Sequence, residues 1–84
     1  MDNQARIKAS NGRLKNGGVR VRIQAIGSSL YLRATLPPKP GSDKETPYQQ
    51  RIALGTAPNP RTIKLAESEA RKVGALLETN SFDW

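Results

Sequence analysis

Two short segments in which apolar and polar residues alternate constrain the fold of this chain more than any other feature. In residues 19–25, VRVRIQA, an aliphatic residue occupies every second position, and residues 30–36, LYLRATL, repeat the pattern. Successive side chains of a strand point to opposite faces, so each segment predicts a strand with one apolar and one polar face. The short Gly27-Ser28-Ser29 connection predicts that the two strands pair as an antiparallel hairpin.

A third strand and a long helix are expected in the second half of the chain. Residues 48–54, YQQRIAL, alternate more weakly and follow a loop at residues 37–47 that contains four prolines. Asn59 and Pro60 suit the start of a helix, and Asn80 suits a left-handed residue at its end. Between them, one apolar stripe predicts a helix over about residues 60–79: Ile63, Ala66, Ala70, Val73 and Leu77.

These elements predict an α+β fold, in which a three-stranded antiparallel sheet is packed on one face by a single C-terminal helix. Residues 1–17 are polar and end in Asn16-Gly17-Gly18, so we expect a flexible basic arm there. Residues 18–80 then form the folded domain, and residues 81–84 begin a linker to a following domain. Phe82 and Trp84 belong to that linker or pack back over the helix.

The positive charge of the chain is concentrated in one half. Residues 1–51 hold ten lysines and arginines against three carboxylates, whereas residues 52–84 hold four of each, for a net charge of +7. This asymmetry favours a polyanionic partner, either nucleic acid or an anionic membrane surface. A basic surface that only keeps the protein in solution is the alternative.

The composition argues against several other classes of function. The chain has no cysteine and no histidine, so we expect no metal site, no cofactor and no redox chemistry. Ser28 and Ser29 have no base beside them, and 84 residues leave room for one thin core, so we expect no enzyme activity. No apolar run approaches the roughly 20 residues of a membrane span, and the start MDNQARIKAS lacks the apolar part of a signal peptide. We expect a soluble intracellular protein.

One helix can cover only one face of the sheet, so the other face must be exposed. The aliphatic set is expected under the helix: Val19, Val21, Ile23, Leu30, Leu32, Ala34, Ile52 and Leu54. The exposed face then carries our candidate DNA-binding residues: Arg20, Arg22, Gln24, Tyr31, Arg33, Thr35, Gln49 and Arg51.

Four arginines without a carboxylate are an unfavourable choice for a sheet face that serves folding alone, because like charges on adjacent strands repel. The major groove of DNA offers guanine acceptors to arginine and adenine edges to glutamine, with phosphates on both sides. The sequence therefore predicts a double-stranded DNA partner. An ordinary solvated basic face remains the alternative, and Tyr31 is better explained as a good strand former than as a stacking residue.

The segment from Ile52 to Trp84 resembles the end of the N-terminal arm-type DNA-binding domain of phage-like tyrosine recombinases (integrases). In that family a strand ends in a Leu-Gly pair, a short turn with Pro and Asn opens a helix rich in Ala, Glu and Lys/Arg, and an ending like Phe-Asp-Trp leads to the next domain. The corresponding features here are Leu54-Gly55, residues 56–60, the helix, and Ser81 to Trp84.

This resemblance implies a sheet laid into the major groove of arm-type sites, with the remaining domains of a recombinase as partners. Matched strand positions imply Arg20, Arg22, Arg33 and Arg51 as contacts. Catalysis in the family uses histidine and a tyrosine nucleophile in a separate domain, and this chain has only Tyr31 and Tyr48, so the resemblance implies no cleavage or ligation by it.

Two other functions remain open. A protein-interaction domain would dock its partner through the helix or through Phe82 and Trp84. An RNA-binding sheet would use the same open face, but such sheets usually present several aromatic residues for stacking, whereas this face has Tyr31 alone.

Overall fold

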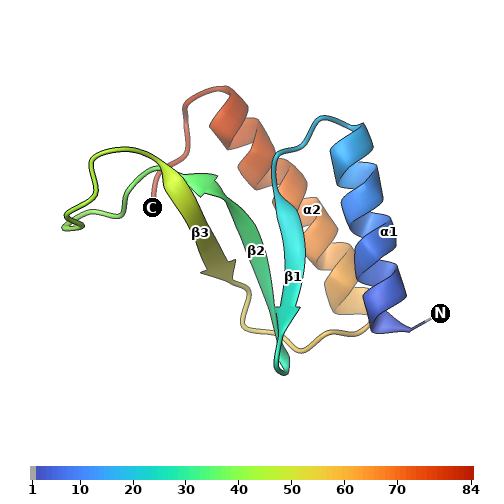
Figure 1. Ribbon diagram of the computed structural model, residues 1–84. Helices are drawn as coiled ribbons and strands as arrows, with labels where there is room; N and C mark the ends of the chain where they lie inside the picture. The colour runs from blue at the N-terminus through green and yellow to red at the C-terminus, as the bar shows by residue number, and fades with distance from the viewer. Residues whose placement is uncertain (1) are drawn as a thin grey trace.

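The computed structural model describes residues 2–84 as three strands and two helices (Figure 1). In chain order these are α1 (Asn3–Asn16), β1 (Arg22–Ile26), β2 (Ser29–Leu36), β3 (Tyr48–Ala53) and α2 (Pro60–Glu78). The strands form one antiparallel sheet in the order β1-β2-β3. The predicted α+β fold, with a C-terminal helix packed on a three-stranded antiparallel sheet, is confirmed.

The hairpin of β1 and β2 closes through a two-residue turn. Ile26 pairs with Ser29, so only Gly27 and Ser28 lie between the strands, and Gly27 has a φ of +60°. A positive φ at the first turn residue matches the right-handed twist of the flanking strands, and glycine adopts it without steric cost. The turn therefore fixes the register that places Ile23 opposite Leu32.

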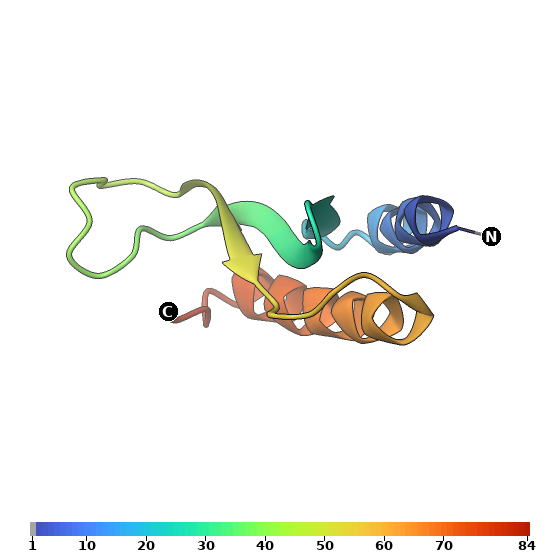
Figure 2. The same cartoon turned by 90° about the horizontal axis from the view of Figure 1, so that it is seen from below.

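The apolar face of the sheet is covered by α2, which packs over β1 and β2 (Figure 2). Eight aliphatic residues were predicted to lie under the helix. Three of them, Val19, Ile52 and Leu54, are half-buried against the core, and the other five are buried in it: Val21, Ile23, Leu30, Leu32 and Ala34. The predicted apolar stripe of α2 packs into the same core, and its last residue, Leu77, is half-buried at the border of the core. The fully buried or nearly buried apolar residues are Leu14, Val21, Ile23, Leu30, Leu32, Ala34, Leu36, Ile63, Ala66, Ala70 and Val73.

Both ends of α2 form as the sequence predicts. The Asn59 side chain accepts a hydrogen bond from the Thr62 amide at 2.9 Å, and Pro60 occupies the first turn. At the other end Asn80 has a φ of +54°, and the Ser81 amide donates to the Leu76 carbonyl at 2.8 Å. This is the Schellman arrangement, which satisfies the last carbonyls of the helix.

The expectation of a flexible arm over residues 1–17 is wrong for residues 3–16, which form α1; Met1 lies outside the described residues. Asp2 caps the helix by accepting a hydrogen bond from the Ala5 amide at 2.7 Å. Gly18, at a φ of +75°, ends it, and the Val19 amide then donates to the Leu14 carbonyl at 2.9 Å. The helix is ordered because its caps are complete and Leu14 is fully buried in the core.

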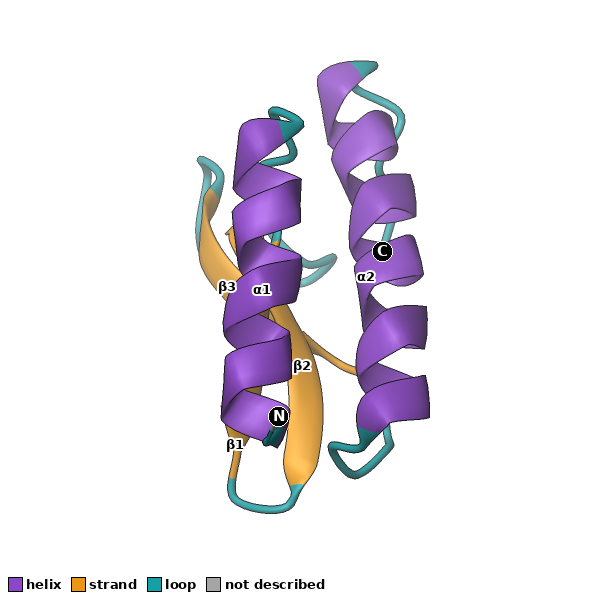
Figure 3. Cartoon of the chain, turned by 90° about the vertical axis from the view of Figure 1, so that its right-hand side faces the viewer, coloured by secondary structure: helices purple, strands orange, loops and turns teal. Residues whose placement is uncertain are grey.

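α1 lies beside α2 along the edge of the sheet formed by β1, as the view onto the two helices shows (Figure 3). Viewed along the sheet, α1 continues the layer of the strands while α2 forms the layer beneath (Figure 2). The Asn11 side chain joins α1 to this edge: its amide nitrogen donates to the Ile23 carbonyl at 3.0 Å, and its oxygen accepts from the Ile23 amide at 2.8 Å. Asn11 thus satisfies backbone groups that an edge strand would otherwise leave open.

The C-terminal residues pack back onto the chain. Phe82 packs against the core, and its ring meets Trp84 edge-on at 5.3 Å between centroids. The Trp84 indole donates a hydrogen bond to the Pro37 carbonyl at 2.6 Å, at the start of the long loop between β2 and β3. These contacts engage both aromatic rings with the domain itself.

Candidate nucleic-acid interface

The sheet face away from α2 carries a row of three arginines, one from each strand. Arg22 on β1 pairs with Arg33 on β2, and Arg33 pairs with Arg51 on β3. Neighbouring strands lie about 4.8 Å apart, so this arginine row spans roughly 10 Å across the sheet. None of the residues in the three strands is Asp or Glu. The row therefore concentrates three positive charges with no carboxylate among the strand residues.

Polar side chains flank the arginine row on both sides. Gln24 and Tyr31 pair on the turn side of the row, and Thr35 pairs with Gln49 on the side of the long loop. We refer to these seven positions as the open sheet face: Arg22, Gln24, Tyr31, Arg33, Thr35, Gln49 and Arg51. Seven of the eight residues expected on this face are thus brought together by the register.

The three guanidinium groups differ in how they are held. Arg22 is half-buried and donates through one Nη to the backbone carbonyls of Val19 and Val21, the latter at 2.9 Å. The Arg51 Nε donates to Gln24 Oε1 at 2.9 Å, so this side chain reaches across β2 from β3 toward β1. Arg33, in the middle, has no ion pair or hydrogen bond from its side chain within residues 2–84.

This arrangement leaves donors available for an external anion or base edge. Arg22 and Arg51 are oriented by their neutral partners yet keep further N–H groups, because a guanidinium has five donors. A guanidinium can donate two parallel hydrogen bonds to a phosphate or to a guanine, and a glutamine amide can pair with an adenine. The open sheet face therefore has the donors that a nucleic-acid surface requires.

Arg20 does not join the arginine row. It precedes β1, whose pairing begins at Arg22, and it lines a shallow cavity of about 150 Å³ together with Gly74, Leu77 and Glu78 of α2. The alternation of residues 19–25 extends beyond the paired strand because Val19 and Val21 already pack against the core as the chain leaves α1.

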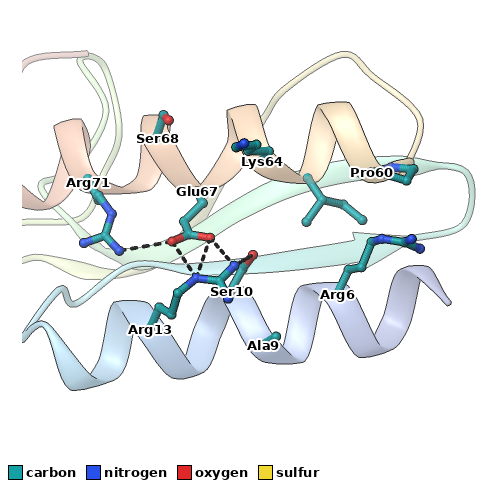
Figure 4. Close-up of a pocket in the computed structure, with 10 residues that line it drawn as sticks. Arg6, Ala9, Ser10, Arg13, Pro60, Lys64, Glu67, Ser68 and Arg71 are labelled. Carbon is teal, nitrogen blue, oxygen red and sulfur yellow. Dashed lines mark hydrogen bonds and ion pairs between the residues drawn. The ribbon is translucent and has the colours of Figure 1, made fainter. Parts of the chain in front are cut away.

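Four cations of the segment expected to be a flexible arm lie instead on α1: Arg6, Lys8, Arg13 and Lys15. Arg13 and Arg6 face a groove of about 570 Å³ between α1 and α2 (Figure 4). Asp2 before the helix and Gly17-Gly18 after it were the signals in the sequence that could have revealed this helix, since they are typical cap residues.

One ion-pair cluster in this groove joins the helices. Arg13 donates to Glu67 through its Nε and through one Nη, the latter at 2.7 Å, and Arg71 donates to the same carboxylate at 3.0 Å (Figure 4). The hydrogen bond from Arg13 lowers the pKa of Glu67 to about 2, although partial burial of the carboxylate opposes the shift. The cluster thus gives Arg13 an internal partner and fixes α1 against α2.

The described part of the chain contains neither a cluster of metal ligands nor a helix that could span a membrane. No three His, Cys, Asp or Glu side chains among residues 2–84 gather where they could hold a metal ion. Neither α1 nor α2 combines the length and the apolar character needed to cross a lipid bilayer.

Comparison with known proteins identifies relatives over nearly the whole chain. A family model described as the XisA/XisC N-terminal domain matches residues 1–84. "Excisase C" of Nostoc sp. strain PCC 7120 is 36% identical over 83 residues, which are 96% of this chain and 17% of that protein. "Excisase A" of the same strain is 40% identical over 78 residues, which are 88% of this chain and 16% of that protein. The chain spans about one sixth of the length of these relatives. No solved structure matches it significantly.

Proposed function

The chain belongs to the family of XisA/XisC N-terminal domains, and we propose that it is a DNA-binding module that acts in DNA recombination. In this proposal the open sheet face enters the major groove of a duplex. One observation carries it: three arginines pair directly across three strands, on a face whose strands contain no carboxylate.

The electrostatics of the arginine row support a binding role. Directly opposed like charges destabilise a sheet, so three arginines in register lower the stability of the free domain. An anionic ligand converts this repulsion into attraction, and each phosphate neutralised also releases counterions into solution. The row is therefore most favourable when DNA is bound.

The dimensions of the sheet also fit this role. The major groove is about 12 Å wide, and the arginine row is about 10 Å across. Arg33 at the centre of the row would reach base edges, while the flanking side chains from β1 and β3 would reach bases near the groove walls or the phosphates. Gln24 and Gln49 add amides suited to adenine.

The names of the relatives support the same setting, since both are called excisases. We further propose, as the resemblance to phage-like tyrosine recombinases implies, that the duplex is an arm-type site. The domain would then work tethered to further domains of a recombinase. Tethering raises the effective concentration at the site, so modest affinity of the isolated domain would suffice. In this proposal the domain supplies binding energy and no catalytic group.

The proposal is tested by removing the arginine row. Fluorescence anisotropy with a labelled mixed-sequence duplex at low salt should show at least about tenfold weaker binding by the Arg22→Ala/Arg33→Ala/Arg51→Ala variant, because three cations that neutralise phosphates or contact bases are lost. The matched control is Arg61→Ala/Lys64→Ala/Lys72→Ala, which removes the same charge from exposed positions of α2. Unchanged binding by the first variant, or equal losses in both, would contradict the proposal.

A further inference from the structure

The side chains of two lysines on α1, Lys8 and Lys15, take no part in the contacts that hold this helix. Both are exposed, and the side chain of neither forms an ion pair or a hydrogen bond within residues 2–84. The helix contains no Asp or Glu, so no carboxylate on α1 offsets their charge. This differs from Arg13, whose charge is met by Glu67.

The contacts of α1 determine which way these lysines face. Lys8 lies three residues before Asn11 and Lys15 four residues after it, so the three side chains share one side of the helix. Asn11 points at the edge of β1, as its two hydrogen bonds with Ile23 show. Ser10 and Arg13, on the other side of the buried Leu14, face α2.

The layers of the fold then place the two lysines relative to the sheet. α1 lies beside β1 in the layer of the strands, and α2 lies beneath (Figure 2). Around the circumference of α1, starting from the side that faces α2, the order is the buried Leu14, then Asn11 at the sheet edge, and then Lys15 and Lys8. They therefore lie toward the side of the molecule that carries the open sheet face.

We propose that Lys8 and Lys15 form a phosphate-contacting edge, with α1 lying over the sugar-phosphate backbone that borders the groove occupied by the sheet. This inference rests on the proposed function. The sheet nearly fills a groove about 12 Å wide, so the next element outward, a helix about 10 Å across, meets the backbone rather than the bases. Lysine is a compact point charge suited to phosphate without base selectivity.

The position of this edge is fixed by the fold. The Asn11 bonds hold α1 to β1 on one side, and the Arg13–Glu67 ion pair holds it to α2 on the other. Lys8 and Lys15 are seven residues apart, about 10.5 Å along the helix axis, so they would meet different phosphates. The arrangement sets a constant offset between base contacts from the sheet and phosphate contacts from α1.

The salt dependence of binding to a mixed-sequence duplex tests the inference, because each phosphate neutralised contributes about 0.9 to the slope of log K against log salt concentration. The Lys8→Gln/Lys15→Gln variant should lower the magnitude of this slope by about 1.8. Glutamine and lysine have similar helix propensities, and circular dichroism checks that α1 remains formed. The matched control, Lys64→Gln/Lys72→Gln on α2, should keep the wild-type slope.

A second measurement needs no variant. Acetylation of lysines followed by mass spectrometry should show Lys8 and Lys15 protected by bound duplex, while Lys64 and Lys72 stay reactive. An unchanged slope in Lys8→Gln/Lys15→Gln, the same decrease in the control, or no protection of Lys8 and Lys15 overturns the inference. If any one of these results occurs while the arginine-row variant still loses binding, only the phosphate-contacting role of α1 is refuted. If the arginine-row variant binds DNA normally, the proposed function itself is refuted.

Discussion

The two helices of this domain are held to the same sheet by different chemistry. α1 buries Ser10 and Leu14 and depends further on polar contacts, from Asn11 to β1 and from Arg13 to α2. α2 instead buries an uninterrupted stripe: Ile63, Ala66, Ala70, Val73 and Gly74. A helix docked mainly by apolar burial leaves a periodic pattern in the sequence, whereas a helix docked largely by polar contacts does not.

The largest effect is expected from truncating a buried residue of the apolar stripe on α2. Ile63 is 2% exposed, so Ile63→Ala should lower the free energy of unfolding by about 2–5 kcal/mol, through lost burial and the cavity left behind. Urea denaturation measures the loss. Leu65→Ala on the same helix is the matched control, because Leu65 is 56% exposed and its truncation should change stability by about 0.5 kcal/mol or less. Equal effects of the two variants would contradict the assignment of the buried stripe.

A smaller effect is expected from breaking the polar attachment of α1. Asn11→Ala leaves the amide and carbonyl of Ile23 without their partner and should cost about 1–3 kcal/mol. Hydrogen exchange at the Ile23 amide should become faster as well. Asn16→Ala, at an exposed position on the same helix, should change neither quantity. Unaltered exchange at Ile23 in Asn11→Ala would show that the hydrogen bonds do not hold the edge.

The smallest effect concerns the ion pair between the helices, and it depends on pH. The pKa of Glu67 is lowered from 4.5 to about 2, chiefly by the hydrogen bond from Arg13. A carboxyl with a lowered pKa stabilises the folded chain above pH 4.5 and loses that contribution as the pH falls toward 2. Wild type should therefore be more stable than Glu67→Gln at pH 7, and the difference should shrink between pH 4.5 and 2.

The control for this pH dependence is Glu69→Gln. Glu69 pairs with Lys72 at 3.5 Å, and both side chains are largely exposed, so its loss should matter little at any pH. A stability difference between wild type and Glu67→Gln that stays constant from pH 7 to 2 would refute the role of the ion pair.

The sheet and α2 could be predicted from the sequence because the apolar residues of both follow a simple periodicity. Alternation at residues 19–25 and 30–36 predicted the buried faces of β1 and β2, and Asn59, Pro60 and Asn80 marked the ends of α2 correctly. α1 was missed because its caps were read as part of a polar arm and its apolar positions are few. Asn11 can be recognised as an edge contact only when β1 is in place.

The same limits apply to the candidate site. Strand alternation placed Arg22, Arg33 and Arg51 on one face, but only the pairing register shows that they are direct neighbours. Arg20 was assigned to that face because alternation does not reveal where pairing begins. Lys8 and Lys15 could not be placed at all, since their relation to the sheet depends on a helix docked through side chains distant in sequence.

DNA binding by the open sheet face is tested most directly by mapping amide chemical-shift changes when a mixed-sequence DNA duplex is added at low and then moderate salt. We expect the shifts to cluster on β1, β2 and β3 around Arg22, Arg33 and Arg51, and to shrink as salt rises. Shifts confined to the exposed side of α2, or no shifts at all, would contradict the claim that the open sheet face binds DNA.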